Sequence, residues 1–352
     1  MKKFCVFSGF LGSGKTTAMM ALTKYCSAHG RKAAMISNDL GHGVSLADNR
    51  LAQLSGCNAS ELTDECICYQ NENLARRITG YFDEGCELVI SDIPGFGVGA
   101  LEHVYHGLNE KYPGVYDLAP FTVLVEPATV ELLRGGGDDL RYILHTQLAE
   151  ADIIVLNKCD TIDAQDIEYN RAWLRENYPL AECVCISART GDGVEELAHS
   201  ILNSCASMRR PDIGYGGEAF MTAMGGISEY YLQYHAAVCC DTFNGSAYLT
   251  DIAEQVRGSL TGTGCDIPHL KLLAWEPEGD FGKADFIGIG RCTVLTRSFA
   301  KPCTELAVIL NASAVCPADK LGELITGSAL AVSERYGIEV MIFREECFGM
   351  GD

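Results

Sequence analysis

A glycine-rich loop near the amino terminus constrains the fold of this chain more than any other segment. The stretch "GFLGSGKTT" satisfies the pattern G-x-x-x-x-G-K-[ST] with Gly9, Gly14, Lys15 and Thr16. It lies between an apolar run that predicts a buried strand and a segment with helical periodicity, the context in which this pattern forms a phosphate-binding loop. The sequence therefore predicts an α/β domain that binds a nucleoside triphosphate at the start of its first helix.

Each residue type in this loop has a task in binding phosphate. Glycines let backbone N–H groups turn inward, Lys15 reaches the β- and γ-phosphates, and the Thr16 hydroxyl ligates Mg²⁺. Lys15 is also a candidate catalytic residue, because it would neutralise charge that develops during hydrolysis. The predicted phosphate-binding residues are Gly12, Ser13, Gly14, Lys15, Thr16 and Thr17.

Short apolar runs alternate with longer amphipathic segments in the first two hundred residues. The runs that predict strands are residues 4–8, 33–37, 88–92, 121–125, 153–157 and 183–187. The segments that predict helices are residues 16–28, 140–149, 164–177 and 193–205. This alternation indicates a P-loop NTPase fold with a mostly parallel, doubly wound sheet, whose ligands bind at the carboxyl ends of the strands.

The segment "IIVLNKCD" indicates which base is bound, since it has the N-K-x-D arrangement of guanine-specific proteins. The carboxylate of Asp160 can accept two hydrogen bonds from guanine N1–H and its 2-amino group, a donor pair that adenine lacks. GTP is therefore favoured over ATP, and a small-molecule kinase, which would prefer ATP, is disfavoured. The turn in "ISARTGDGVEEL" would offer backbone N–H groups to the guanine carbonyl. The predicted base-binding residues are Asn157, Lys158, Asp160, Ser187, Ala188 and Arg189.

Two acidic residues after predicted strands are candidates for Mg²⁺ binding and catalysis. Asp92 ends the strand in "ELVISDIPGFG", where it can hold Mg²⁺ through water, and Gly95 follows three residues later, where its N–H can contact the γ-phosphate. Asp39, in "SNDLG", is a further candidate to bind Mg²⁺ or to position water. The alternative for Asp39 is a turn-forming Asn-Asp pair.

Composition excludes several classes of function. The formal net charge of −20 would repel a phosphate backbone, so nucleic acid is not expected as a partner. No apolar run approaches the ~18 residues needed to cross a bilayer, so no membrane span is expected. The apolar start runs into "GSGKTT" instead of a signal-peptide cleavage site. The 17 cysteines are irregularly spaced, which favours reduced thiols and a cytoplasmic protein.

A Pro- and Gly-rich stretch, "MRRPDIGYGGEAF", separates two regions of different pattern. We expect a GTPase domain over 1–207, a linker over 208–220 and a second domain over 221–352. The second region predicts strands at 230–240, 269–275, 304–314 and 338–343, with helices at 246–260 and 318–336. This order predicts a smaller α+β domain, a ferredoxin-like β-α-β-β-α-β unit whose sheet would suit docking of a client protein.

The order of motifs resembles that of the CobW-like metal-chaperone GTPases, relatives of the urease and hydrogenase maturation GTPases. The matching motifs are "FSGFLGSGKTT", "SNDLG", "ELTDECICY", "SDIPG", "QLAEADIIVLNKCD" and "ISARTGDG". The resemblance covers roughly residues 1–206. It implies a GTP-dependent metallochaperone or metal-cofactor insertase that binds Zn²⁺, Co²⁺ or a similar ion, serves a client enzyme and forms a homodimer when loaded with nucleotide.

Two positions depart from the family's pattern. The metal motif of the family is usually C-x-C-C, but here Cys66 and Cys68 are followed by Tyr69. The family's acidic E-x-x-G motif appears here with Asp92 before Gly95, a shorter acid that keeps the charge. The first departure leaves the metal's identity open, while the second preserves the chemistry.

Cys66 and Cys68 are candidate transition-metal ligands, because such ions take three or four ligands from Cys, His and carboxylate side chains. Tyr69 is a poor third ligand because its phenol is neutral at pH 7. The candidates to complete the set are Cys57, His42, Glu65 or the matching pair of a second subunit. Alternatively, both thiols pack beneath a helix that begins near Gln70.

Two functions remain open on these residues. The first is a slow GTPase that delivers a metal or organometallic cofactor to a client enzyme. The second is a nucleotide-gated accessory protein, without metal cargo, for assembly or reactivation of a corrinoid or other cofactor enzyme. The cysteines that could add a metal site in the second domain, or else be buried thiols, are Cys239, Cys240, Cys303, Cys316 and Cys347.

Overall fold

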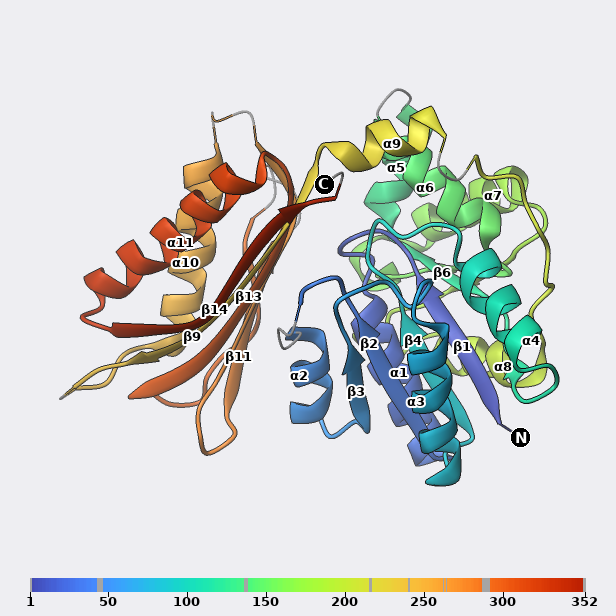
Figure 1. The fold of residues 1–352 in the computed structure, drawn as a ribbon, viewed down its shortest axis with the longest axis horizontal. Coiled ribbons are helices and arrows are strands. Elements are labelled where there is room, and N and C mark those ends of the chain that lie inside the picture. The colour runs from blue at the N-terminus through green and yellow to red at the C-terminus, as the bar shows by residue number, and fades with distance from the viewer. Residues whose placement is uncertain are drawn as a thin grey trace. The chain divides into compact units, whose positions relative to one another are not determined.

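The chain forms two compact units (Figure 1). The first comprises Met1–Leu40 and Ser55–Ala223, and the second comprises Gly41–Leu54 and Met224–Asp352. Gly41–Leu54 thus groups with the carboxy-terminal unit although it lies far upstream in the sequence. The computed structural model describes residues 2–42, 47–135, 139–214, 217–239, 241–261, 263, 265–286 and 292–350.

The first unit is built on a sheet whose paired strands are all parallel. Across the sheet the strands are β3 (Ala59–Leu62), β2 (Ala33–Asn38), β4 (Leu88–Asp92), β1 (Lys3–Ser8), β6 (Thr122–Val125), β7 (Ile153–Leu156) and β8 (Glu182–Cys185). The short β5 (Asp117–Leu118) pairs with β1. The P-loop NTPase fold and the six strands expected from the apolar runs are confirmed.

Helices cover both faces of this sheet, which is why its strands are apolar on both sides. They are α1 (Lys15–Ala28), α3 (Asn71–Asp83), the π-helix η1 (Leu101–His106), α4 (Gly107–Lys111), α5 (Pro127–Gly135), α6 (Asp139–Glu150), the 3₁₀-helix η2 (Cys159–Thr161), α7 (Ala164–Asn177) and α8 (Val194–Asn203). On β1, Phe4 and Val6 share one core with residues of α3, η1, α5, α6 and α7. On the other side α1 contacts α8.

Local signals set where several helices start. The Asp163 side chain accepts a hydrogen bond from the Asp166 N–H at 2.9 Å and caps α7. The Asn244 side chain caps α10 (Gly245–Leu260) of the second unit in the same way, through the Ala247 N–H at 3.0 Å. Such caps satisfy backbone donors that have no partner within the helix.

The second unit is an antiparallel sheet with two helices on one face (Figure 1). Across the sheet the strands are β12 (Val294–Arg297), β11 (Phe281–Phe286), β10 (Asp266–Trp275), β13 (Glu305–Val315), β9 (Ile227–Ala237) and β14 (Glu339–Gly349). The helices are α10 (Gly245–Leu260) and α11 (Ala318–Arg335), preceded by α9 (Glu218–Gly225). The order β10-β13-β9-β14 with these two helices is the predicted ferredoxin-like unit, extended at one edge by β11 and β12.

The opposite face of this sheet contacts α2 (Ala47–Leu54), the helix from the upstream segment. Asp48 forms an ion pair with Lys271 at 2.5 Å, and the Arg50 guanidinium lies 4.7 Å from the ring centroid of Trp275. The Asn311 side chain accepts a hydrogen bond from the Ala47 N–H at 3.2 Å. These contacts explain why the segment belongs to the second unit.

One cysteine pair differs from the expectation of reduced thiols. Cys265 and Cys316, at the facing ends of β10 and β13, form a disulfide with a Cα–Cα distance of 4.9 Å. Cys303 is buried, Cys239 is exposed, and Cys347 is half-buried, while Cys240 falls outside the described residues.

Within the described ranges, no helix is both long and apolar enough to span a bilayer.

Candidate functional site

The phosphate loop links β1 to α1 through a run of backbone conformations that suit glycine. Gly9, Gly12 and Gly14 have φ angles of 131°, 75° and 92°. A Cβ on Gly14 would lie 2.4 Å from the Asn157 Nδ2 atom, so both conformation and space require glycine there. The Lys15 ammonium donates to the Gly9 carbonyl at 2.6 Å. The loop therefore places a cation and the amino end of α1 where a triphosphate would bind.

Asn157 joins the predicted base-binding loop to the phosphate loop. Its Nδ2 donates to the Ser13 carbonyl at 2.8 Å, and its Oδ1 accepts from the Ala188 N–H at 3.0 Å. Asn157 is 2 % exposed, so these two bonds hold three loops in one place. The structure therefore brings together the phosphate motif, the N-K-x-D motif and the S-A-R turn, which are far apart in the sequence.

Asp160 is held ready to accept hydrogen bonds. The Ser187 hydroxyl donates to Asp160 Oδ1 at 2.6 Å, and the Arg189 guanidinium bonds Oδ2. The Ser187 bond is the largest cause that lowers the Asp160 carboxyl pKa, with Arg189 adding to it. Lys158 adopts a φ of 62° and pairs with Glu126 at 2.7 Å. An ionised Asp160 fits the donor pair of guanine.

The predicted Mg²⁺ ligands lie at the carboxyl ends of neighbouring strands. Asp92 ends β4 and is 5 % exposed, and its Oδ1 accepts from the Asn38 N–H at 2.8 Å. Asp39 follows β2, and its N–H donates to the Leu62 carbonyl at 3.3 Å. Thr16 lies in the first turn of α1, which follows β1. Hydroxyl and carboxylate oxygens are the ligands that Mg²⁺ prefers, so this donor set fits that ion.

Gly95 lies directly against the phosphate loop. A Cβ at this position would be 2.4 Å from Leu11 Cδ2 and 3.1 Å from the Leu11 nitrogen. The backbone of Gly95 can therefore approach the phosphate loop as no larger residue could, which is what a γ-phosphate contact requires.

Two residues of α6 that no sequence motif predicts hold the loop around Gly95. Gln147 donates through Nε2 to the carbonyls of Gly95 at 3.0 Å and Gly97 at 2.9 Å. Glu150 accepts from the Gly99 N–H at 2.7 Å, and burial raises the pKa of its carboxyl to about 7. Both side chains are at most 2 % exposed. Polar residues spaced i, i+3 among the apolar positions of "ILHTQLAE" were the available signal.

The cysteine loop follows β3, next to the Mg²⁺ edge. The Cys68 N–H donates to the Cys66 sulfur at 3.5 Å, and the Cys68 thiol hydrogen bond lowers the pKa of Cys66. The same pairing and burial raise the pKa of Cys68. The Cys66 thiol therefore loses its proton more readily than the Cys68 thiol, and the thiolate is the form that binds metals.

Asn38 ties this loop to Asp92. Its side chain donates to the carbonyls of Leu62 and Glu65, each at 3.0 Å, and accepts from the Ile67 N–H at 2.9 Å. Its own N–H donates to Asp92, as described above. One residue that is 4 % exposed therefore connects the predicted Mg²⁺ ligand to the backbone on either side of Cys66.

The structure does not bring Cys57 to the cysteine loop. Cys57 precedes β3, at the end of that strand opposite to this loop, and is 9 % exposed. Tyr69 is 63 % exposed, and His42 belongs to the second unit, where it bonds Glu346 at 2.6 Å. Among the residues that the structure describes, no group of three His, Cys, Asp or Glu side chains is arranged to hold a metal ion.

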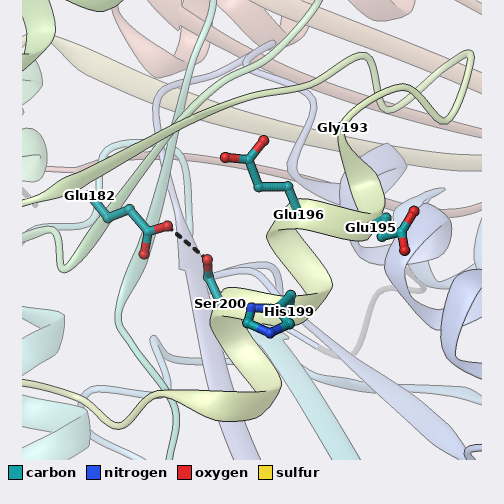
Figure 2. A pocket seen from close by; sticks show the side chains of 6 residues that line it. All are labelled: Glu182, Gly193, Glu195, Glu196, His199 and Ser200. Atoms are coloured by element: carbon teal, nitrogen blue, oxygen red, sulfur yellow. Dashed lines mark hydrogen bonds between the residues drawn. The ribbon is translucent and has the colours of Figure 1, made fainter.

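A cavity of about 640 Å³ lies along α8 and β8. Figure 2 shows the residues that line it, of which only Glu182 and Ser200 are joined, by a hydrogen bond of 2.8 Å. The carboxylates of Glu195 and Glu196 point in different directions and do not converge with His199 on a common point. None of the residues that line this cavity is a predicted nucleotide or metal ligand.

Comparison of the sequence with known proteins identifies the family of this chain. The sequence model of the CobW/HypB/UreG nucleotide-binding domain matches residues 3–184. The chain belongs to this CobW/HypB/UreG family. The zinc chaperone CobW of Pseudomonas aeruginosa is 25 % identical over 218 residues, which are 52 % of this chain and 56 % of that protein. The chain therefore spans about half the length of this curated relative.

Two solved structures are similar to this chain at low sequence identity. HypB from Helicobacter pylori, solved in complex with nickel, is 18 % identical with a TM-score of 0.40, and the match covers 56 % of this chain and 83 % of that one. Zn(II)-bound YjiA GTPase from E. coli is 15 % identical with a TM-score of 0.36, covering 92 % and 98 %. Membership of this nucleotide-binding family rests on the sequence match, and it supports guanine nucleotide as the ligand of the CobW-like unit.

Proposed function

We propose that this CobW-like chain binds GTP with Mg²⁺, hydrolyses it slowly, and uses the cycle to hold and release a transition metal for a client enzyme. The observation that carries this proposal is the hydrogen bonding of Asn38, which contacts both Asp92 and the backbone around Cys66. The proposed setting is the cytoplasm, where free thiols such as Cys66 and Cys68 stay reduced.

Hydrolysis in this proposal depends on positioning and charge. Lys15 neutralises the β- and γ-phosphates, while Thr16 and Asp92 hold Mg²⁺ and Asp39 binds the ion or orients water. The Gly95 N–H contacts the γ-phosphate, and Gln147 holds that loop through two carbonyls. The site offers a cation and fixed dipoles but no strong base among these residues, which is consistent with a slow reaction.

Release of metal follows because Asn38 is bonded both to the nucleotide site and to the cysteine loop. When the γ-phosphate leaves, the loop after Asp92 loses a contact, and Asp92 and Asn38 can shift with it. A shift of Asn38 would disturb the backbone bonds at Glu65 and Ile67 that hold Cys66 in place. The metal site would therefore bind more weakly after hydrolysis.

The metal in this proposal is a borderline ion such as Zn²⁺ or Co²⁺. Cys66 and Cys68 supply two sulfur ligands, and such ions need three or four. Because Cys57 lies at the opposite end of β3, the matching pair of a second copy is the proposed source of the others. This completion requires a GTP-dependent homodimer.

Metal titration tests the proposal. Zn²⁺ and Co²⁺ would be added to the protein with GTP analogue or GDP, and compared with a Cys66→Ser, Cys68→Ser double variant. We expect one ion per dimer in the GTP-analogue state and none in the variant. Cys57→Ser is the matched control and should bind as the wild type does. Unchanged stoichiometry in the double variant would contradict the cargo role.

A second candidate is a nucleotide-gated accessory protein for a corrinoid or other cofactor enzyme, with no metal cargo. Tyr69 favours it, because this side chain stands where the family usually has a third cysteine. The same titration separates the two functions, since this candidate predicts GTP-dependent binding of a partner without any metal uptake.

A further inference from the structure

Three cysteines meet where β7 and β8 end, outside the site described above. Cys183 and Cys185 are two residues apart on β8 and therefore point to the same face of the sheet. Cys185 pairs in register with Leu156, and the Cys159 thiol donates to the Leu156 carbonyl at 3.2 Å. The Cys159 N–H also bonds the carbonyl of Ile186 at 3.1 Å. Backbone pairing thus places Cys159 beside Cys185.

The three thiols lie close enough to shift one another's pKa, and Cys185 interacts with both Cys159 and Cys183. Cys159 and Cys185 are partly exposed, whereas Cys183 is 6 % exposed. Small reagents can therefore reach the first two more readily than the third.

The surroundings of Cys185 favour its thiolate. Hydrogen bonds from Cys159 and Cys183 lower the pKa of Cys185 most, and the positive charges of Arg171 and Arg175 on α7 add to them. A partly exposed thiolate near cations is the setting in which cysteines react with disulfides.

This cluster is attached directly to the base-binding loops. Cys159 is the variable residue of the N-K-x-D motif, and Cys185 precedes Ser187 by two positions. Those loops are joined by the Ser187–Asp160 hydrogen bond of 2.6 Å. Any change in the distance between Cys159 and Cys185 acts on Asp160.

We propose that Cys159 and Cys185 are a redox-active dithiol that reacts with low-molecular-weight disulfides and, when oxidised, weakens guanine binding. The Cys185 thiolate attacks the small disulfide, forms a mixed disulfide and expels one thiolate. Cys159, after losing its proton, attacks the Cys185 sulfur and expels the second thiolate. Two protein thiols are oxidised to one disulfide, and one small disulfide is reduced to two thiols.

Geometry selects this pair over Cys183 with Cys185. Residues two apart on a strand have Cα atoms about 6.6–6.8 Å apart, at the limit for a disulfide, and their side chains stand parallel. Cys159 and Cys185 approach from different segments, and an S–S bond of about 2.05 Å would draw them closer than thiol contact does. The bond would pull Asp160 away from its position beside Ser187.

The test combines peptide mapping with nucleotide affinity. Reduced protein would be treated with oxidised glutathione, digested and analysed by mass spectrometry, and GDP affinity would be measured before and after. We expect a Cys159–Cys185 cross-linked peptide and a loss of affinity of about tenfold, as for losing one hydrogen bond to a charged group. Added reductant should restore the affinity.

Variants make the outcome decisive. Cys159→Ser and Cys185→Ser should keep their GDP affinity under oxidation, while Cys205→Ser, which changes an exposed thiol elsewhere, should respond like the wild type. In the wild type, a stable glutathione adduct on Cys185, or an oxidised protein with undiminished affinity, would overturn the proposal. The effect on affinity rests on the proposed guanine site, but the cross-link does not, so failure of that site would show separately in the reduced protein.

Discussion

Replacing Asn38 by alanine should separate metal binding from nucleotide binding. The substitution removes three side-chain hydrogen bonds, at 3.0, 3.0 and 2.9 Å, that hold the cysteine loop. At about 1 kcal/mol each, their loss costs roughly 3 kcal/mol. If that energy orders the loop for metal, the affinity falls by about 100-fold, since 1.4 kcal/mol corresponds to tenfold. The backbone N–H to Asp92 remains, so GTP affinity should change little.

The assay is competition for Zn²⁺ with a chromophoric chelator, in the presence of either a GTP analogue or GDP. The wild type should bind Zn²⁺ more tightly with the GTP analogue, and Asn38→Ala should bind weakly with both. Asn203→Ala, which removes one hydrogen bond of 2.9 Å at the exposed end of α8, is the matched control. The reasoning is refuted if Asn38→Ala keeps the wild-type affinity and its dependence on nucleotide.

Three further predictions concern the nucleotide site and its supports. Asp160→Asn should lower GTP affinity by roughly 100-fold through lost charged hydrogen bonds while leaving ATP binding unchanged; calorimetry that shows the GTP preference intact would contradict it. Gly95→Ala should abolish GTP hydrolysis and spare GDP binding, because the new Cβ would lie 3.1 Å from the Leu11 nitrogen; wild-type turnover would count against this role. Glu150→Gln should flatten the pH dependence of stability. The pKa of the Glu150 carboxyl is about 7 in the folded protein and 4.5 in the unfolded chain. The free energy of unfolding of the wild type should therefore fall by about 3 kcal/mol as the pH rises across that interval. Urea unfolding at several pH values checks this, and parallel curves for both proteins would refute it.

The parts that sequence predicts well are those set by local chemistry. Gly14, Lys15 and Thr16 form one continuous motif, and a strand buried on both faces tends to be apolar throughout, as "IIVL" in β7 is. The ferredoxin-like order in the second unit follows from its alternation of strands and helices. The sequence does not predict the added strands β11 and β12, because the residue pattern of short antiparallel strands is weak.

The parts that sequence misses depend on distances across the fold. Cys57 and Cys66 are close in sequence, but a parallel strand between them places them at opposite ends of β3. Gln147 supports the loop of Gly95 across a gap of about fifty residues, which no motif records. Cys159 follows β7 and Cys185 ends β8, and they meet because these two strands pair.

Helix α2 bears on how this protein could have been assembled in evolution. The chain passes between the two units after Leu40, before Ser55 and after Ala223, so they are not joined by a single link. A gene fragment that ended before residue 208 would leave α2 without Lys271 and Trp275, its partners in the second sheet. Recombination that exchanged the carboxy-terminal unit would therefore have to replace this upstream insert as well.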